Sequence, residues 1–181
     1  MSTLESGQSA AVKRPGTRFM RSHPAHIIAQ GFGSGLSPIM PGTSGTLLGW
    51  LSFVVLTLRW PQVFTPQSWA LIIVIGFVLG VWVCEVTGRN LGVPDHGSMV
   101  WDEIVAIWLV LLFILPADLK TQFLAFLLFR FFDMVKPPPI RYFDQHIKGG
   151  FGVMWDDIVA AFYTLLVFAL WTIRIWDVGG L

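Results

Sequence analysis

The sequence has few charged residues and a single cysteine. Asp, Glu, Lys and Arg make up 13% of its 181 residues, half of the roughly 25% typical of soluble domains. A disordered chain is excluded, because disorder needs low hydrophobicity and high net charge. The single cysteine, Cys84, excludes a disulfide within the chain. Twelve basic residues stand against eleven acidic ones, so there is no basic excess of the kind that binds nucleic acid.

Several phosphate-binding and phosphatase motifs are also missing. No lysine occurs between Lys13 and Lys120, so the glycine-rich stretch at 31–46 is not a P-loop. Leu36 stands where the dinucleotide-binding motif G-x-G-x-x-G requires its third glycine. The sequence has no Asp-x-Asp pair and no Pro-Ser-Gly-His segment. It therefore lacks the signatures of the common soluble aspartyl-phosphate phosphatases and of the lipid phosphatases with a histidine nucleophile.

Apolar residues are in excess. They make up 54% of the chain, and the mean hydropathy is +0.66, values typical of an integral membrane protein. Apolar runs occur at about 47–58, 69–84, 104–115, 121–132 and 158–173. They predict an all-α fold, a multi-pass helical membrane bundle with about five apolar helices. Several runs are shorter than the roughly 17 residues that a crossing needs, so we expect three to five crossings.

The basic residues favour a cytoplasmic N-terminus. Residues 1–22 are expected to form a polar tail without the apolar stretch of a secretory signal, and residues 23–181 a single membrane domain. With five crossings and the N-terminus inside, eight Lys and Arg residues lie on inner segments and three on outer segments. Positive residues are enriched on cytoplasmic segments. This topology puts the polar candidates described below on the cytoplasmic face, a polar site at one membrane interface.

Five carboxylates border the apolar runs and are candidate metal ligands. They are Asp102, Glu103, Asp133, Asp156 and Asp157. Acids near a bilayer are costly and usually functional, and oxygen-rich sites suit Mg²⁺, Mn²⁺ or Ca²⁺. Each acid pair could instead cap a helix, but Asp133 follows its run and would oppose the helix dipole. The pairs lie in the similar segments WDEIVA at 101–106 and WDDIVA at 155–160, which predicts two helix starts facing a common place.

Basic side chains accompany one of these acids. Arg130, Asp133 and Lys136 follow one another at a spacing of three, which places them within an arc of ~60° on a helix. Pro137 is expected to end that helix. Two cations and an anion on one stripe can hold a phosphate and a metal together. The alternative is a ladder of ion pairs with cations that extend to the membrane surface.

Hydroxyl and imidazole side chains supply further candidates. Ser37, Thr43 and Thr46 lie in the glycine-rich stretch at 31–46, where hydroxyls and exposed N–H groups can cradle an anion. The alternative is a tight loop that leads into a membrane helix. His96 is a candidate metal ligand or proton carrier, or else a loop histidine that contacts the backbone.

Four segments together resemble the phosphatidylglycerophosphatase A family. They are GFGSGLSPIMPGTSGT (31–46), DHGSMVWDE (95–103), FRFFDMVKPPPIRYFD (129–144) and GGFGVMWDDIVA (149–160). One departure is Ala106, where we expect a glycine after the Asp-Glu pair. The resemblance implies an all-helical, Mg²⁺-dependent hydrolase of the bacterial inner membrane. Such an enzyme removes the terminal phosphate of phosphatidylglycerophosphate and leaves phosphatidylglycerol.

For such a hydrolase, the candidate residues suggest a mechanistic hypothesis. One or two Mg²⁺ ions would be held by Asp102, Glu103, Asp133, Asp156 and Asp157. The catalytic residues would be Glu103, Asp133, Lys136 and Asp156, with Glu103 as a general base. The substrate phosphate would be bound by Arg130, Lys136, Ser37, Thr43, Thr46 and His96. Attack by a metal-activated water and a covalent aspartyl-phosphate both remain open.

Two other functions compete with a lipid phosphatase. A membrane transporter for a cation or small molecule would also use the acidic cluster, but its polar residues should lie near the midplane of the bilayer. A structural membrane subunit would give Arg130, Asp133 and Lys136 no evident task. The expected partners are the lipid substrate and the bilayer, and no nucleic acid.

Overall fold

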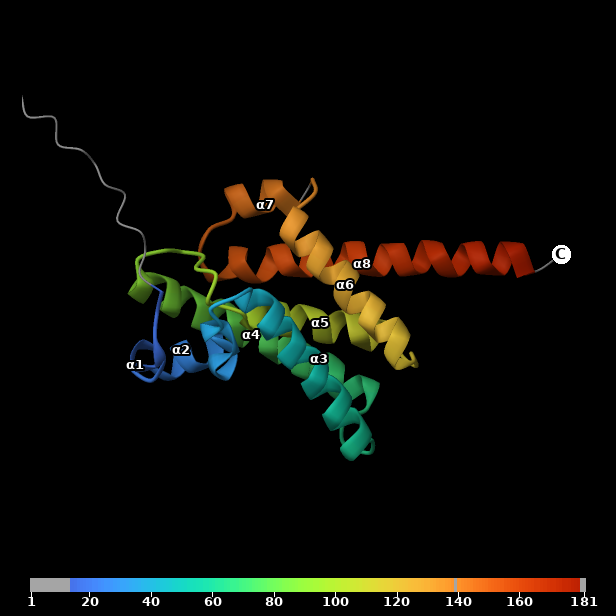
Figure 1. Ribbon diagram of the computed structural model, residues 1–181, viewed down its shortest axis with the longest axis horizontal. Helices are drawn as coiled ribbons and strands as arrows, with labels where there is room; N and C mark the ends of the chain where they lie inside the picture. The colour runs from blue at the N-terminus through green and yellow to red at the C-terminus, as the bar shows by residue number, and fades with distance from the viewer. Residues whose placement is uncertain (1–13, 139, 180–181) are drawn as a thin grey trace, which may run out of the picture.

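The fold is entirely helical over the described residues, which are 14–138 and 140–179 of a computed structural model (Figure 1). The elements are α1 (Thr17–Met20), α2 (Pro24–Ala29), the 3₁₀ helix η1 (Gly31–Leu36), α3 (Pro41–Arg59), α4 (Pro66–Leu91), α5 (Trp101–Phe113), α6 (Leu119–Val135), α7 (Ile140–His146) and α8 (Gly149–Gly179). The predicted all-α fold is confirmed. The five predicted apolar runs fall in α3, α4, α5, α6 and α8, but a bundle of about five membrane helices stays a prediction.

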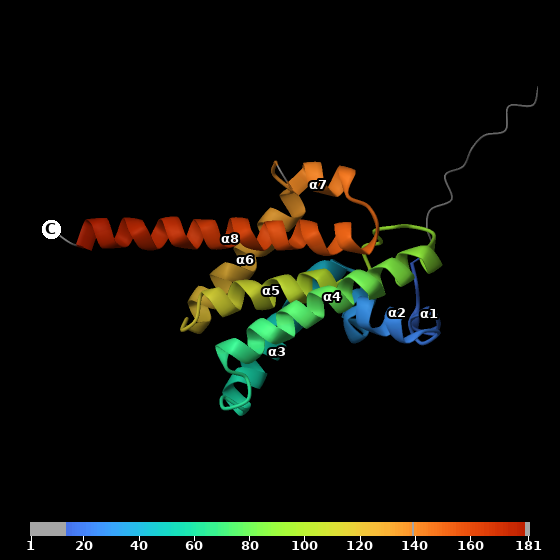
Figure 2. The same cartoon turned by 180° about the vertical axis from the view of Figure 1, so that it is seen from behind.

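These five helices alternate in direction. In Figure 1, α3, α5 and α8 begin toward the end of the molecule that carries α1 and α2, and α4 and α6 return toward it. Figure 2 shows the same bundle from behind, with α4 lying along α5. The first turns of three helices and the last turns of two therefore gather at one end, as the predicted topology requires.

Three helices are long and apolar enough to cross a membrane. They are Pro41–Arg59, Pro66–Leu91 and the Gly149–Trp171 part of α8. Helices α5 and α6 have 13 and 17 residues, so both fall short of the ~20 residues of a perpendicular crossing. The structure thus indicates membrane association through α3, α4 and α8.

Local capping sets several helix ends. The Thr65 hydroxyl accepts a hydrogen bond from the Ser68 N–H at the start of α4, and Gly92 ends that helix with a left-handed φ of 72°. The Asp118 carboxylate accepts the Thr121 N–H at 2.8 Å at the start of α6. Hydrogen bonds from the Thr121 hydroxyl and backbone N–H hold the pKa of Asp118 below its usual range.

Helix α8 begins earlier than its apolar run predicts. The run starts at residue 158, but the helix starts at Gly149, whose φ is +78°. Asp156 and Asp157 therefore lie inside α8, and the prediction that they open a helix is wrong. An apolar run marks the stretch in contact with apolar surroundings, whereas the helix start depends on backbone contacts. The 31–46 stretch likewise divides into η1 and the first turns of α3, so Thr43 and Thr46 are helical.

The start of α8 is held tightly against α4. A Cβ on Gly150 would lie 1.9 Å from the Val81 carbonyl oxygen, so only glycine allows this crossing. The Gly150 N–H donates to Glu85 Oε2 at 2.8 Å, which satisfies one of the unpaired donors of the first helical turn. This junction fixes the position of Asp156 and Asp157 relative to α4.

Replacing Glu85 by alanine is expected to lower the free energy of unfolding by about 1 kcal/mol, because the Gly150 N–H loses a charged acceptor. Thermal unfolding in detergent measures the loss. Arg89→Ala is the matched control: the exposed Arg89 pairs with Glu85 at 2.7 Å, and such surface pairs contribute little. A Glu85→Ala variant as stable as Arg89→Ala would contradict the capping role.

Candidate active site

Three buried carboxylates meet at the gathered helix ends. Asp102 and Glu103 lie in the first turn of α5, and Asp157 reaches them from α8. One oxygen from each lies within 4.8 Å of the others. Their exposed fractions are 8%, 9% and 3%. The two similar segments of the sequence do bring their acids to a common place, as predicted, although only the first one opens a helix.

The acid trio (Asp102, Glu103 and Asp157) has the chemistry of a cation site. Among the described residues, no hydrogen-bond partner reaches Asp102 Oδ1, Glu103 Oε2 or Asp157 Oδ2, and all three atoms are buried. Buried carboxylates repel one another and need a compensating charge. The positive end of the α5 dipole compensates part of the negative charge of Asp102 and Glu103. Oxygen-only ligands suit Mg²⁺, Mn²⁺ or Ca²⁺, so these residues fit a divalent cation.

Arg130 ties the acid trio to two further helices. It projects from α6 and is 9% exposed. Its Nη1 lies 2.5 Å from Asp133 Oδ2, 3.6 Å from Glu103 Oε1 and 3.5 Å from Thr46 Oγ1 of α3. Its Nε is buried without a described partner. One guanidinium thus brings α3, α5 and α6 together beside the carboxylates and retains a donor.

Lys136 lies at the end of α6 and meets the other acid of α8. It caps the C-terminus of the helix with a left-handed φ of 45°, and its Nζ lies 2.6 Å from Asp156 Oδ2. Arg130 and Lys136 both form ion pairs, so the ion-pair alternative describes their present contacts. Asp133 shares Arg130 with Glu103 of the trio, and Asp156 directly precedes Asp157 in α8, so both ion pairs adjoin the acid trio.

The first turn of α3 packs directly against Glu103 and Arg130, because the residue at this contact is a glycine, Gly42. A Cβ on Gly42 would lie 2.3 Å from Glu103 Oε1 and 2.9 Å from Arg130 Nη2. The Thr46 hydroxyl donates to the Gly42 carbonyl at 2.9 Å. The Thr43 hydroxyl is buried and has no partner among the described residues. Of the predicted hydroxyls, that of Thr46 lies 3.5 Å from Arg130 Nη1, and Thr43 lies in the first turn of the same helix.

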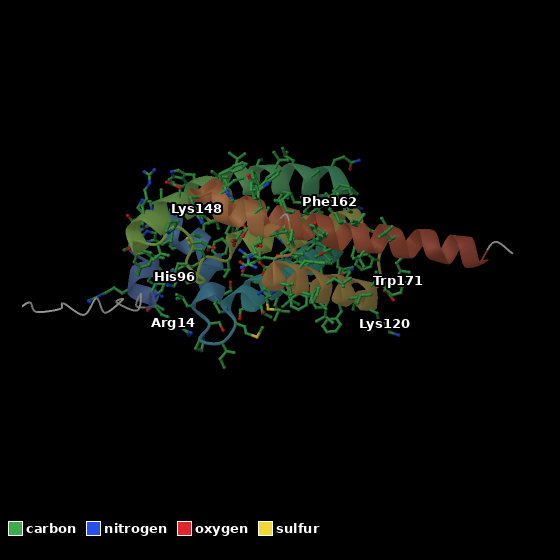
Figure 3. All side chains as sticks on the ribbon, turned by 90° about the horizontal axis from the view of Figure 1, so that it is seen from above. Arg14, His96, Lys120, Lys148, Phe162 and Trp171 are labelled. Carbon is green, nitrogen blue, oxygen red and sulfur yellow. The ribbon has the colours of Figure 1, made fainter. Side chains whose placement is uncertain are left out.

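Ser37 and His96 lie elsewhere. Both border a separate cavity, together with Arg14 and Pro41. The Ser37 hydroxyl donates to the Ile39 carbonyl at 2.8 Å. His96 Nδ1 accepts the Ser98 N–H at 3.1 Å, so the backbone contact foreseen as an alternative is present. Figure 3 shows His96 and Arg14 toward the same end of the molecule as Lys148, away from Lys120 and Trp171.

The chain matches a known protein family over most of its length. The family model described as Phosphatidylglycerophosphatase A matches residues 27–172, a range that contains the acid trio, Arg130 and Lys136. This chain belongs to the phosphatidylglycerophosphatase A family. The four sequence segments that carry the resemblance all lie within the matched range, and the predicted resemblance is confirmed.

Curated relatives agree with the family. Phosphatidylglycerophosphatase A of Escherichia coli (strain K12) is 43% identical over 80% of this chain and 81% of its own length. The Haemophilus influenzae protein of the same name is 43% identical over 85% of this chain and 91% of its own. A Bacteroides thetaiotaomicron protein, provisionally named a phosphatidylinositol-3-phosphatase, is 37% identical over 80% of this chain and 91% of its own length. No solved structure matches the chain.

The sequence analysis of this phosphatidylglycerophosphatase A family member did not single out Gly42, which abuts Glu103 and Arg130. The signal is present, since Gly42, Gly45 and Gly49 recur on one helix face. A Cβ on Gly45 would lie 2.5 Å from Val100 Cβ, and one on Gly49 2.6 Å from Ile107 Cγ2. The three glycines let α3 approach α5 closely, and Thr46 of α3 contacts Arg130 beside Glu103.

Gly42→Ala is expected to lower the free energy of unfolding by about 1–3 kcal/mol, as overpacking of a tight contact does. It should also lower kcat/KM, because the added methyl displaces Glu103 or Arg130. Urea unfolding and phosphate release measure the two effects. Gly16→Ala is the control, since nothing lies within 4 Å of its added Cβ. Equal behaviour of the two variants would contradict the close approach of α3.

Proposed function

We propose that this chain is a Mg²⁺-dependent lipid phosphatase that hydrolyses phosphatidylglycerophosphate to phosphatidylglycerol in phospholipid biosynthesis. Its family indicates a phosphoric monoester hydrolase. The observation that carries the proposal is the buried acid trio beside Arg130. Anionic ligands for a cation and a cationic group for a phosphate stand together there, which is what phosphomonoester hydrolysis requires.

Asp102, Glu103 and Asp157 would hold the metal, with Asp133 and Asp156 as further carboxylates at its edge. When bound, Mg²⁺ supplies positive charge for the phosphoryl oxygens and lowers the pKa of a coordinated water. The buried, partnerless oxygens of the trio support this assignment. The choice of Mg²⁺ among the hard cations is part of the proposal.

Arg130 and Lys136 would bind the reacting phosphate and stabilise its charge as the ester bond breaks. Arg130 presents donors in a planar fork that matches phosphate oxygens, and its Nε has no described partner. The Thr43 hydroxyl, also buried and without a partner in the described part of the chain, would donate a further hydrogen bond, and Thr46 would hold Arg130 in place. Lys136 would move from Asp156 to the phosphate when substrate binds.

The proton of the attacking water would pass to a carboxylate of the site. Glu103 directs Oε1 toward Arg130 and has a second oxygen without a described partner, so it can both contact the metal and accept a proton. Asp133 and Asp156 would position Arg130 and Lys136 through the ion pairs already formed. The proposed catalytic set is Glu103, Asp133, Lys136 and Asp156.

The proposed location is the bacterial inner membrane, with the site facing the cytoplasm. The three apolar helices suggest membrane association. Arg14 and Lys148 lie toward the site end, and Lys120 lies toward the other (Figure 3), in keeping with positive residues inside. The acyl chains would remain in the bilayer beside the helices, so only the headgroup would need to reach the acids.

The test is phosphate release by the full chain in detergent with phosphatidylglycerophosphate as substrate and mass spectrometry of the lipid product. We expect release with Mg²⁺, none with chelator, and a loss of at least about 100-fold in Asp156→Asn. Phosphatidylinositol 3-phosphate, offered in parallel, should be the poorer substrate. Cation flux across sealed vesicles without phosphate release would overturn the proposal in favour of the transporter hypothesis, which no finding supports so far.

A further inference from the structure

A cavity opens beside the start of α3. Its volume is about 230 Å³. It is bordered by Arg14, Pro15, Gly35, Leu36, Ser37, Pro41, His96, Gly97 and Ser98. These residues come from the segment before α1, from the end of η1, from the loop that follows it and the first residue of α3, and from the loop before α5. Helix α3 thus has the acid trio beside Gly42 and this cavity beside Pro41.

The charge of the cavity favours an anion. Arg14 contributes a guanidinium and His96 an imidazole, and none of the described residues that border it is a carboxylate. Three other surface cavities each border a carboxylate: Asp118, Asp95 or Glu85. A guanidinium and an imidazole, with no carboxylate among the described residues that border the cavity, are typical of a phosphate site.

The donors of the cavity are held in place. Arg14 Nη1 donates to the Pro38 carbonyl at 2.6 Å, which fixes the guanidinium against the loop that leads into α3. His96 Nδ1 contacts the Ser98 hydroxyl at 2.9 Å, so Nε2 is the ring nitrogen that can meet a ligand. Ser98 is in turn contacted by the buried Gln30, at 3.4 Å. Donors fixed in advance lose little entropy when an anion binds.

The cavity lies close to Arg130 and the acid trio. Pro41 borders the cavity and Gly42 abuts Glu103 and Arg130, and the Cα atoms of successive residues lie ~3.8 Å apart. The lipid of the proposed function carries two phosphates, a terminal monoester and an inner diester, joined by one glycerol. We propose that the Arg14–His96 cavity binds the inner phosphodiester while the monoester is hydrolysed at the acid trio. This inference rests on the proposed function. Binding of the diester in the cavity would make the enzyme selective for headgroups with two phosphates.

Two water-soluble substrates test the selectivity of the full chain in detergent. Glycerophosphoglycerophosphate carries both phosphates, whereas glycerol 3-phosphate carries only the monoester. Arg14→Gln should lower kcat/KM for the first about tenfold, the scale of one charged hydrogen bond, and leave the second unchanged within error. His96→Gln should act in the same direction. Arg18→Gln, a basic residue of α1 that does not border the cavity, should change neither.

Equal losses with both substrates would show that the cavity serves the reacting phosphate, and no loss with either would show that it binds no substrate. Both results overturn the inference. If the wild-type chain hydrolyses phosphatidylglycerophosphate but neither soluble compound, binding tests the cavity alone. If it hydrolyses none of the three, the proposed function fails. Calorimetric titration with glycerophosphoglycerol, which has only a diester, should show binding that Arg14→Gln weakens about tenfold. Arg14-dependent binding of inorganic phosphate without binding of the diester would identify a site for free phosphate instead.

Discussion

Replacing Asp157 by asparagine is expected to lower phosphate release at least about 100-fold, the scale of one lost electrostatic contact at a transition state. Without metal, the same variant should be as stable as the wild type or more stable. Asp157 is 3% exposed and lies among two other buried carboxylates. Removing one negative charge relieves their repulsion, because replacing buried charges by neutral groups of similar shape is often neutral or stabilising.

Thermal unfolding with Mg²⁺ or with chelator separates the two effects. Mg²⁺ should raise the melting temperature of the wild type, since a ligand that binds only the folded state stabilises it, and should leave Asp157→Asn unchanged. Asp118→Asn is the matched control: its carboxyl caps α6 and does not belong to the acid trio, so the metal effect should persist. A metal effect retained in Asp157→Asn would contradict the assignment of the trio.

Arg130→Met is expected to cost about 3–5 kcal/mol of unfolding free energy, as the loss of one partner from a buried ion pair does. The reason is that Glu103 and Asp133 lose the cation that lies between them, and Thr46 loses a donor. Arg130→Lys should recover only part of this, because an ammonium group cannot reach several acceptors in the fixed plane of a guanidinium. Urea unfolding in detergent gives the free energies.

Lys136→Met is the comparison for this prediction. The Lys136 side chain is 27% exposed, against 11% for Arg130, so water screens its pair with Asp156 more strongly and the loss should be smaller. Both variants should lose phosphate release. An Arg130→Met protein as stable as Lys136→Met would show that Arg130 does not hold α3, α5 and α6 together.

The sequence predicts a helix start well where charged residues and the beginning of an apolar run occur together. At α5, the acid pair directly precedes an apolar run, and the helix begins at Trp101 as expected. At α8, the start depends on Gly149 and Gly150 packing against α4, which is a tertiary contact that no local pattern reveals. The short helices α1, α2 and α7 lie outside the apolar runs and were not predicted.

The members of the site were predictable, but their pairing was not. Carboxylates at the membrane end of apolar helices are costly, which is why Asp102, Glu103 and Asp157 stand out in the sequence. That Lys136 meets Asp156 depends on the left-handed residue that ends α6. That Ser37 and His96 border another cavity depends on how the loops before α3 and α5 fold together. Contacts between distant segments decide both.

The most direct test of the account is a Mg²⁺ titration of phosphate release from phosphatidylglycerophosphate by metal-stripped protein. The wild type should be inactive in chelator and should gain activity along a saturating curve as Mg²⁺ is added. Asp157→Asn should stay below about 1% of that activity at every concentration. Full activity in chelator, or the same titration curve for both proteins, would contradict the claim that the acid trio holds the metal on which hydrolysis depends.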